Sequence, residues 1–164
     1  IQLSSNQATP NHHDIESLLT QAADAETAGH HLKAEQLYRR CLAIEPTHGG
    51  ALLNLGNVIF NHGSIRTACE LYRAATRAQP QFALAWYNLG NALDELEDRE
   101  AAAIALIQAV TIDPDYADAH FNLALVCEKL GDRNQARNHW SAYVRLRPNE
   151  PSADTARAFL EHGD

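Results

Sequence analysis

Residues 83–116 read ALAWYNLGNALDELEDREAAAIALIQAVTIDPDY, and this stretch sets the pattern for most of the chain. Its proline, Pro114, follows Pro80 by 34 residues, and Pro46 and Pro148 extend the series at the same spacing. A constant spacing of this length indicates a repeated structural unit. Alignment on the prolines divides the chain into four blocks, which are residues 15–48, 49–82, 83–116 and 117–150.

Each block contains two stretches with the spacing of an amphipathic helix. Apolar or small residues recur at positions 4, 7, 8 and 11 of the block, on one face of a first helix, and at positions 20, 24 and 27, on one face of a second. The exceptions on the first helices are Gln21 at position 7 and His120 at position 4. Positions 8 and 20 hold only Gly or Ala, which would let the two helices approach closely. Polar turn residues separate the two stretches, and the proline at position 32 ends the second. Each block is therefore predicted to form a helical hairpin.

The pattern resembles the tetratricopeptide repeat, through W-x2-L-G-x2-[YIL], A-x3-[FYL] and a proline in a 34-residue unit. The resemblance covers about residues 15–148 and implies an all-α fold, a right-handed α-solenoid of four helical hairpins. Residues 151–164 contain one more amphipathic stretch and are predicted to form a C-terminal capping helix. Residues 1–13 are polar and lack the period, so we expect a disordered lead-in before the repeats at 14–150. The prediction is thus about nine helices and no strand.

Composition excludes several classes of function. The 164 residues include 21 Asp and Glu against 13 Lys and Arg, and the net charge of -8 would repel a nucleic-acid backbone. The longest apolar stretch, Ala101–Ile107, is far shorter than the ~20 residues that cross a bilayer. An odd number of cysteines, three, suits a reducing compartment, so we expect a cytoplasmic protein. The absence of Met indicates that the chain is a piece of a longer protein.

No group of residues has the spacing of a catalytic, cofactor or metal site. The chain lacks a nucleophile elbow and a phosphate-binding glycine loop. Two pairs of adjacent histidines lack further ligands at metal-binding spacing, and neighbours on a helix point about 100° apart. The pairs are His12-His13 and His30-His31. The three cysteines lie in different blocks and are expected to be packing thiols without a disulfide. We therefore predict no enzyme activity, no metal and no cofactor.

The resemblance implies a concave groove lined by positions 2, 5, 6, 9, 12 and 13 of the first helices. Position 6 holds Asn54, Asn88 and Asn122, and position 9 holds Asn57 and Asn91. Asn lowers helix propensity, so its recurrence requires an explanation. Because an amide both donates and accepts hydrogen bonds, these residues could form a ladder along the backbone of an extended peptide. Alternatively, they join adjacent first helices and shape the superhelix, and the two roles are compatible.

The charges of the groove predict the chemistry of its ligand. Within the family, grooves that clamp an acidic C-terminal peptide resemble one another in having Lys at position 5, whereas position 5 is apolar here. Positions 12 and 13 collect Glu26, Asp94, Glu95 and Glu128, with Lys129 the single cation among them. This favours a neutral or basic ligand with apolar anchors. The alternative is that these charges only solvate exposed helix ends.

We therefore predict a scaffold that binds a peptide or partner protein in the concave groove, and make no prediction of its oligomeric state. The alternative is an arm of a larger protein, either a helix-turn-helix transcriptional regulator or a glycosyltransferase, that recruits partners or substrates. The candidate groove residues are Leu53, Asn54, Asn57, Tyr87, Asn88, Asn91, Glu95, Phe121, Asn122 and Glu128.

Overall fold

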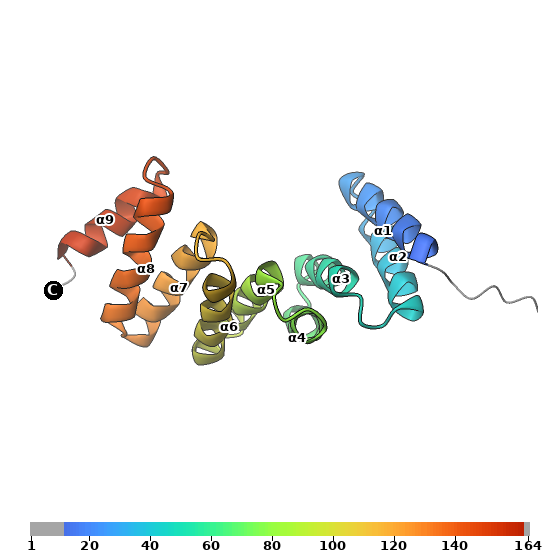
Figure 1. Ribbon diagram of the computed structural model, residues 1–164, viewed down its shortest axis with the longest axis horizontal. Coiled ribbons are helices and arrows are strands. Elements are labelled where there is room, and N and C mark those ends of the chain that lie inside the picture. The colour runs from blue at the N-terminus through green and yellow to red at the C-terminus, as the bar shows by residue number, and fades with distance from the viewer. Residues whose placement is uncertain (1–11, 163–164) are drawn as a thin grey trace, which may run out of the picture.

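The computed structural model describes residues 12–162, which form nine helices (Figure 1). They are α1 His12–Thr27, α2 His31–Ile44, α3 Gly49–Asn61, α4 Ile65–Ala78, α5 Ala83–Glu95, α6 Arg99–Ile112, α7 Ala117–Leu130, α8 Arg133–Leu146 and α9 Ser152–His162. Helix α1 begins at His12, so the last two residues of the predicted lead-in are helical, and the rest of that segment lies outside the described residues.

The helices form an elongated array that runs from α1 at one end to α9 at the other (Figure 1). They pack most extensively in consecutive pairs, α1 with α2, α3 with α4, α5 with α6 and α7 with α8, and less extensively between one pair and the next. No strand occurs within residues 12–162, and no helix there is both long and apolar enough to cross a membrane. The prediction of an all-α solenoid is confirmed.

The prolines of the 34-residue series mark the end of each second helix. Helices α2, α4, α6 and α8 each end two residues before their proline. The intervening residue leaves the helical conformation; Glu45, for example, has φ -129° and ψ 91°. This geometry follows from the proline ring, which disfavours helical backbone in the residue before it. The position-32 proline therefore sets the point at which the chain turns to the next pair.

Small residues at position 8 allow the two helices of a pair to cross closely. At Gly56 a Cβ atom would lie 2.5 Å from Cε1 of Tyr72, and at Gly90 it would lie 2.6 Å from Cγ of Leu106. Both facing side chains stand at position 24 and are buried. The glycines are thus required by the bulk of the residues opposite them, as the pattern predicted.

Helix α9 covers the end of the core that α8 would otherwise leave open. Its Ala153 and Ala156 are fully buried, and its Phe159 ring lies 6.5 Å from the ring of Trp140. The Tyr143 hydroxyl of α8 also shares a hydrogen bond with Ser152 Oγ. An apolar end face of a solenoid needs such a cover, which agrees with the predicted role of this segment.

Candidate binding groove

Three adjoining hollows lie mainly along the first helices of the pairs. The C-terminal hollow measures about 440 Å³, the central hollow about 280 Å³ and the N-terminal hollow about 480 Å³. Asn122 lines both the C-terminal and the central hollow, and Asn91 lines both the central and the N-terminal hollow. The three hollows therefore join into one surface, which we call the groove.

The groove contains most of the predicted site residues. Seven of the ten line a hollow, namely Asn57, Tyr87, Asn88, Asn91, Glu95, Phe121 and Asn122. The remaining three, Leu53, Asn54 and Glu128, line none of these hollows. Neighbouring first helices thus bring together residues that are far apart in the sequence.

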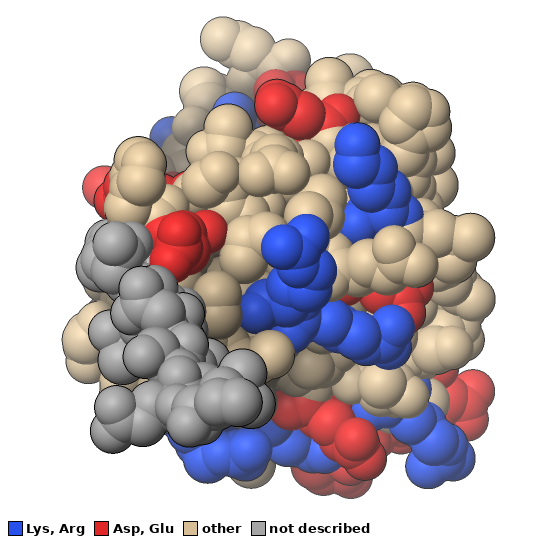
Figure 2. All heavy atoms as spheres, turned by 90° about the vertical axis from the view of Figure 1, so that its right-hand side faces the viewer, with Lys and Arg blue, Asp and Glu red and all other residues tan. Residues whose placement is uncertain are grey.

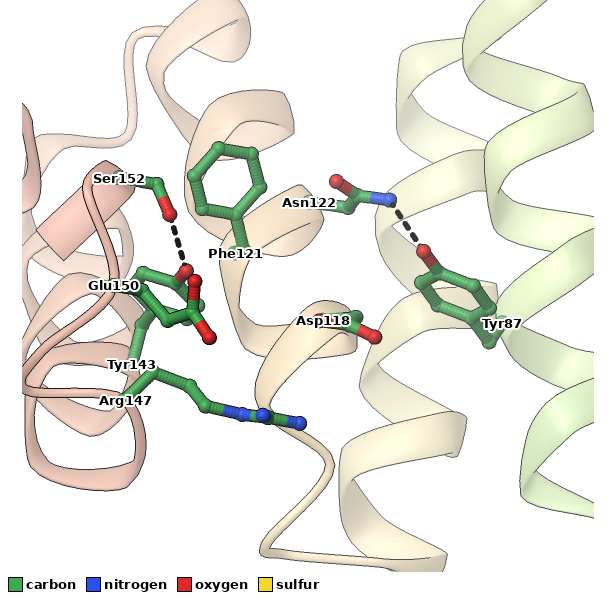
Figure 3. Close-up of a pocket in the computed structure, with 8 residues that line it drawn as sticks. All are labelled: Tyr87, Asp118, Phe121, Asn122, Tyr143, Arg147, Glu150 and Ser152. Atoms are coloured by element: carbon green, nitrogen blue, oxygen red, sulfur yellow. Dashed lines mark hydrogen bonds between the residues drawn. The ribbon is translucent and has the colours of Figure 1, made fainter.

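The C-terminal hollow combines aromatic rings with charged groups (Figure 3). Tyr87 from α5 and Phe121 from α7 stand on either side of Asn122, whose Nδ2 donates a hydrogen bond to the Tyr87 hydroxyl at 3.2 Å. The carboxylates of Asp118 and Glu150 also line the hollow. Its full lining is Tyr87, Asp118, Phe121, Asn122, Tyr143, Arg147, Glu150 and Ser152. Such a hollow could accept a side chain with an apolar stem and a polar end.

The asparagines link successive first helices to one another. Asn88 Nδ2 donates to Asn57 Oδ1 at 2.8 Å, and Asn122 Nδ2 donates to Asn91 Oδ1 at 2.7 Å. In both cases the residue at position 6 of one block donates to the residue at position 9 of the block before it. The geometry gives the asparagines the helix-joining role that was one of the two interpretations of the pattern.

Each asparagine pair also keeps free polar atoms. Within residues 12–162, Oδ1 of Asn88 and of Asn122 has no hydrogen-bond partner, and neither has Nδ2 of Asn57 or of Asn91. Each pair therefore presents one free acceptor and one free donor. A peptide unit presents the complementary N–H and C=O groups. The joining role thus leaves the ladder hypothesis open.

The structure corrects the prediction that Leu53 is a groove residue. Its side chain is only 3% exposed and belongs to the core. Tyr87 and Phe121, at the same position, are partly exposed and line the C-terminal hollow. The two rings extend further from the backbone than Leu53 does, so Tyr87 and Phe121, and not Leu53, offer an apolar anchor in the C-terminal hollow.

Asn54 and Glu128 were also predicted to be groove residues, but in the structure their side chains interact with buried aromatic residues. The Asn54 side chain interacts with the Tyr38 hydroxyl and lowers its pKa, against the larger effect of burial. Glu128 Oε1 accepts a hydrogen bond from Trp140 Nε1 at 2.6 Å. A buried N–H without a partner would cost free energy, so Glu128 satisfies the indole of Trp140.

The position-12 acids therefore have a role that neither interpretation of the groove charges had considered. Glu26 accepts from the Tyr38 hydroxyl, just as Glu128 accepts from Trp140, and both aromatic residues stand at position 24. Burial and the nearby Glu26 carboxylate raise the pKa of Tyr38. Where position 24 is apolar, Asp94 instead pairs with Lys129 of the next block at 2.5 Å. Some of the groove acids are thus engaged by the protein itself.

Several lining residues were absent from the sequence-based site. Phe60, Asn61, Leu84 and Asp118 stand at groove positions 2, 12 and 13, so the repeat register contained the signal for them. Arg147, Glu150 and Ser152 come from the connection after α8 and from α9. No repeat position indicates these residues, because they lie outside the first helices.

The histidine, cysteine and acidic side chains of the described residues do not form a second chemically reactive site. Within residues 12–162 no three or more His, Cys, Asp or Glu side chains are grouped to hold a metal ion. The three cysteines are buried, and burial raises the pKa of Cys127 to about 11. The face at the α1–α2 end shows acidic and basic side chains interspersed (Figure 2). The groove is therefore the leading candidate site.

Comparison with solved structures places the fold among tetratricopeptide-repeat proteins. MamA superposes with a TM-score of 0.82 at 24% identity, over 92% of this chain and 82% of that one. YrrB, described as a TPR protein with an unusual peptide-binding site, has a TM-score of 0.75 at 21% identity, over 88% and 76%. The O-GlcNAc transferase of Thermobaculum terrenum has a TM-score of 0.74 at 30% identity, over 85% of this chain but 27% of that enzyme.

Comparison of sequences gives the family. Among curated proteins there is no match. The family described as Cilia and flagella-associated protein 70 C-terminal domain matches residues 2–163, which is nearly the whole chain. The resemblance to tetratricopeptide repeats is confirmed, and the chain belongs to this tetratricopeptide-repeat family.

Proposed function

We propose that the chain is a protein-interaction scaffold that binds an extended peptide segment of a partner protein in the groove. The observation that carries the proposal is the pair of asparagine contacts, because each leaves one free donor and one free acceptor in the groove. The peptide backbone would bind along these amides, and its side chains would enter the hollows. The chain itself would catalyse no reaction.

The groove charges favour a neutral or basic peptide. Glu95 is exposed in the central hollow, and Asp118 and Glu150 are exposed in the C-terminal hollow, against Arg147 as the exposed cation there. The rings of Tyr87 and Phe121 would bind an apolar side chain or the stem of a cationic one. The net charge of -8 favours the same ligand over nucleic acid.

An alternative is that the chain recruits substrates as the helical arm of a larger protein. The similarity to 27% of an O-GlcNAc transferase supports this arrangement, because there a comparable helical array is part of a much longer enzyme. A helix-turn-helix transcriptional regulator is the other larger protein in which the chain would form such an arm. The groove would bind peptide in either setting.

The test is to select binders from a degenerate peptide library with the full chain and to measure their dissociation constants on variants. Asn88→Ala should weaken each selected peptide by a similar factor, about two- to tenfold, because it removes backbone hydrogen bonds worth roughly 0.5–1.5 kcal/mol each. Tyr87→Ala and Phe121→Ala should instead change which peptides are preferred, because side-chain pockets determine selectivity.

Stability measured on the same variants separates the two roles of asparagine. Asn88→Ala should lower the melting temperature, since its contact with Asn57 joins two helices. If it lowers only the melting temperature and leaves every dissociation constant unchanged, the amides join helices and bind no ligand. If the library yields no binder that competes for the groove, the scaffold proposal itself is wrong.

A further inference from the structure

Helix α6 exposes apolar residues where the second helices of the other blocks expose polar ones. Positions 22 and 25 of the third block are Ile104 and Ile107, which are 63% and 43% exposed. The corresponding pairs are Gln36 and Arg39, Glu70 and Arg73, and Asn138 and Ser141. A solenoid helix needs one apolar face for its neighbours, and α6 has an apolar outer face as well.

A hollow lies beside these residues, between α4, α5 and α6. It measures about 240 Å³, and we call it the α4–α6 hollow. Its lining is Arg73, Thr76, Arg77, Trp86, Leu89, Leu93, Ala101, Ile104 and Ala105. Leu89, Leu93 and Ala105 are buried and form its floor, while Ile104 stands exposed at its wall.

The α4–α6 hollow is separate from the groove. None of the residues that line it lines any of the three groove hollows. On α5, Tyr87, Asn88 and Asn91 point into the groove, while Trp86, Leu89 and Leu93 line the α4–α6 hollow. The two sites therefore use different faces of the same helix.

The charges of this hollow are of one sign. Arg73 and Arg77, both exposed, are the charged residues that line it, and neither forms an ion pair with the described residues. Glu70 lies one turn before Arg73 on α4 but does not line the hollow. In a chain with a net charge of -8, two arginines beside an apolar hollow form a local basic rim.

We propose that the α4–α6 hollow and the outer face of α6 are a second docking surface, which binds an acidic amphipathic helix of a partner protein. Large aliphatic side chains of that helix would cover Ile104 and Ile107 and enter the hollow, and its carboxylates would pair with Arg73 and Arg77. The charge of the rim favours this partner over a second copy of the chain, because two copies with a net charge of -8 each repel one another.

The test uses a synthetic helical peptide of about 18 residues, or five turns, with a leucine stripe flanked by glutamates. A second peptide has lysine in place of every glutamate. Binding to the full chain is followed by the fluorescence of Trp86, which lines the hollow. The Trp86→Phe variant is the control, because it retains only the fluorescence of the buried Trp140. The glutamate peptide should bind at least about tenfold more tightly than the lysine peptide.

Two variants examine the apolar and the charged parts separately. Ile104→Asn with Ile107→Ser introduces the residues of the fourth block and should weaken the glutamate peptide at least about tenfold. Arg73→Glu with Arg77→Glu should reverse the preference between the two peptides. All four residues are exposed, so the melting temperature should change little, and the groove variants Tyr87→Ala and Asn88→Ala should bind the peptide normally.

Three results would overturn the proposal. Equal affinity for the two peptides would exclude an acidic partner, and unchanged affinity in both double variants would place binding elsewhere. A dimer of the unmodified chain that dissociates in the Ile104→Asn, Ile107→Ser variant, measured by light scattering, would assign the surface to a second copy instead. Binding of peptides in the groove is measured on different variants, so a negative result for the α4–α6 hollow would not contradict the groove proposal.

Discussion

The third and fourth helix pairs have the same arrangement of helices, but different side chains form the contacts that hold it. At position 4, Trp86 Nε1 donates to the Pro80 carbonyl oxygen at 2.9 Å, and His120 Nε2 lies 3.0 Å from the Pro114 carbonyl oxygen. A carbonyl only accepts, so His120 carries its proton on Nε2. Imidazole thus replaces indole in anchoring the first helix to the preceding turn.

The replacement brings a second histidine into the structure. The smaller ring of His120 places its Nδ1 3.0 Å from Nδ1 of His139 on α8. When both rings are neutral, His120 Nδ1 carries no proton, and His139 donates this hydrogen bond. Burial lowers the pKa of His139 to about 4, and the smaller cause is the repulsion between the two rings when both are protonated. The fourth pair therefore has a pH dependence that the tryptophan of the third pair lacks.

The two pairs also differ at position 24, which is Leu106 in the third pair and Trp140 in the fourth. Leu106 faces the glycine at position 8 of its block, Gly90, whereas the fourth block has Ala124 at position 8. The indole of Trp140 needs an acceptor, which Glu128 supplies, whereas Leu106 needs none. Each repeat position thus has a structural requirement, such as filling the core or anchoring a helix, that more than one type of residue can meet. Each choice then determines what a neighbouring position must supply.

Among the substitutions that test this comparison, truncation of Trp140 should have the largest effect on the free energy of unfolding. Trp140→Ala should lower the free energy of unfolding by about 3–5 kcal/mol, because it empties a fully buried site and leaves Glu128 without its donor. Leu106→Ala in the third pair should cost less, about 2–4 kcal/mol. Urea denaturation followed by circular dichroism measures both.

Trp140→Leu is the control, because it gives the fourth pair the residue of the third. It should cost less than Trp140→Ala, since it restores apolar volume but not the hydrogen bond. A loss for Trp140→Ala smaller than that for Leu106→Ala would contradict our view that the fourth pair depends more on position 24.

Gly90→Ala should have an intermediate effect. Alanine gains about 1 kcal/mol in helix propensity over glycine. Here, however, its Cβ would lie 2.6 Å from Leu106 Cγ and 3.3 Å from the Ala102 carbonyl oxygen. Overpacking costs about 1–3 kcal/mol, so after the gain in helix propensity we expect a net loss of at most about 2 kcal/mol in chemical denaturation.

The same substitution should become favourable when Leu106 is removed. In a Leu106→Ala background, Gly90→Ala gains helix propensity without the clash and should raise stability. A stabilising Gly90→Ala in the unmodified chain would show that the helices of this pair can move apart at little cost.

The histidine pair should produce the smallest effect. The pKa of His139 in the folded chain, about 4, lies below its ordinary value of 6.5, so the unfolded chain binds more protons between these values. Stability should fall as the pH falls from about 6.5 to about 4 and should not change above that range through this group. After allowance for partial exposure we expect a loss on the order of 1 kcal/mol, or a few degrees in melting temperature.

His120→Trp combined with His139→Ala places the residues of the third pair at both positions. This variant should lose the part of the pH dependence that His139 contributes. An identical decline in melting temperature between pH 6.5 and 4 in both proteins would show that other groups, and not this pair, cause the acid sensitivity.

The helices, their pairing and the end cap could be predicted because their signals are local. Proline spacing and apolar periodicity act within a single block, and they located the ends of α2, α4, α6 and α8. Seven of the ten candidate residues line the groove for the same reason, since their positions on a first helix follow from the register. The burial of Leu53 could not be predicted in this way, because the period indicates the direction in which a side chain points but not how deeply it is buried.

The sequence by itself determined that this chain is a solenoid of paired helices, because helix periodicity, small crossing residues and proline stops are properties of neighbouring residues. Only the tertiary structure decided which polar groups meet. Asn57 and Asn88 are 31 residues apart, Glu128 and Trp140 are 12 apart, and His120 and His139 are 19 apart. Such contacts depend on the angle and depth at which helices pack, which the side chains of both partners set together.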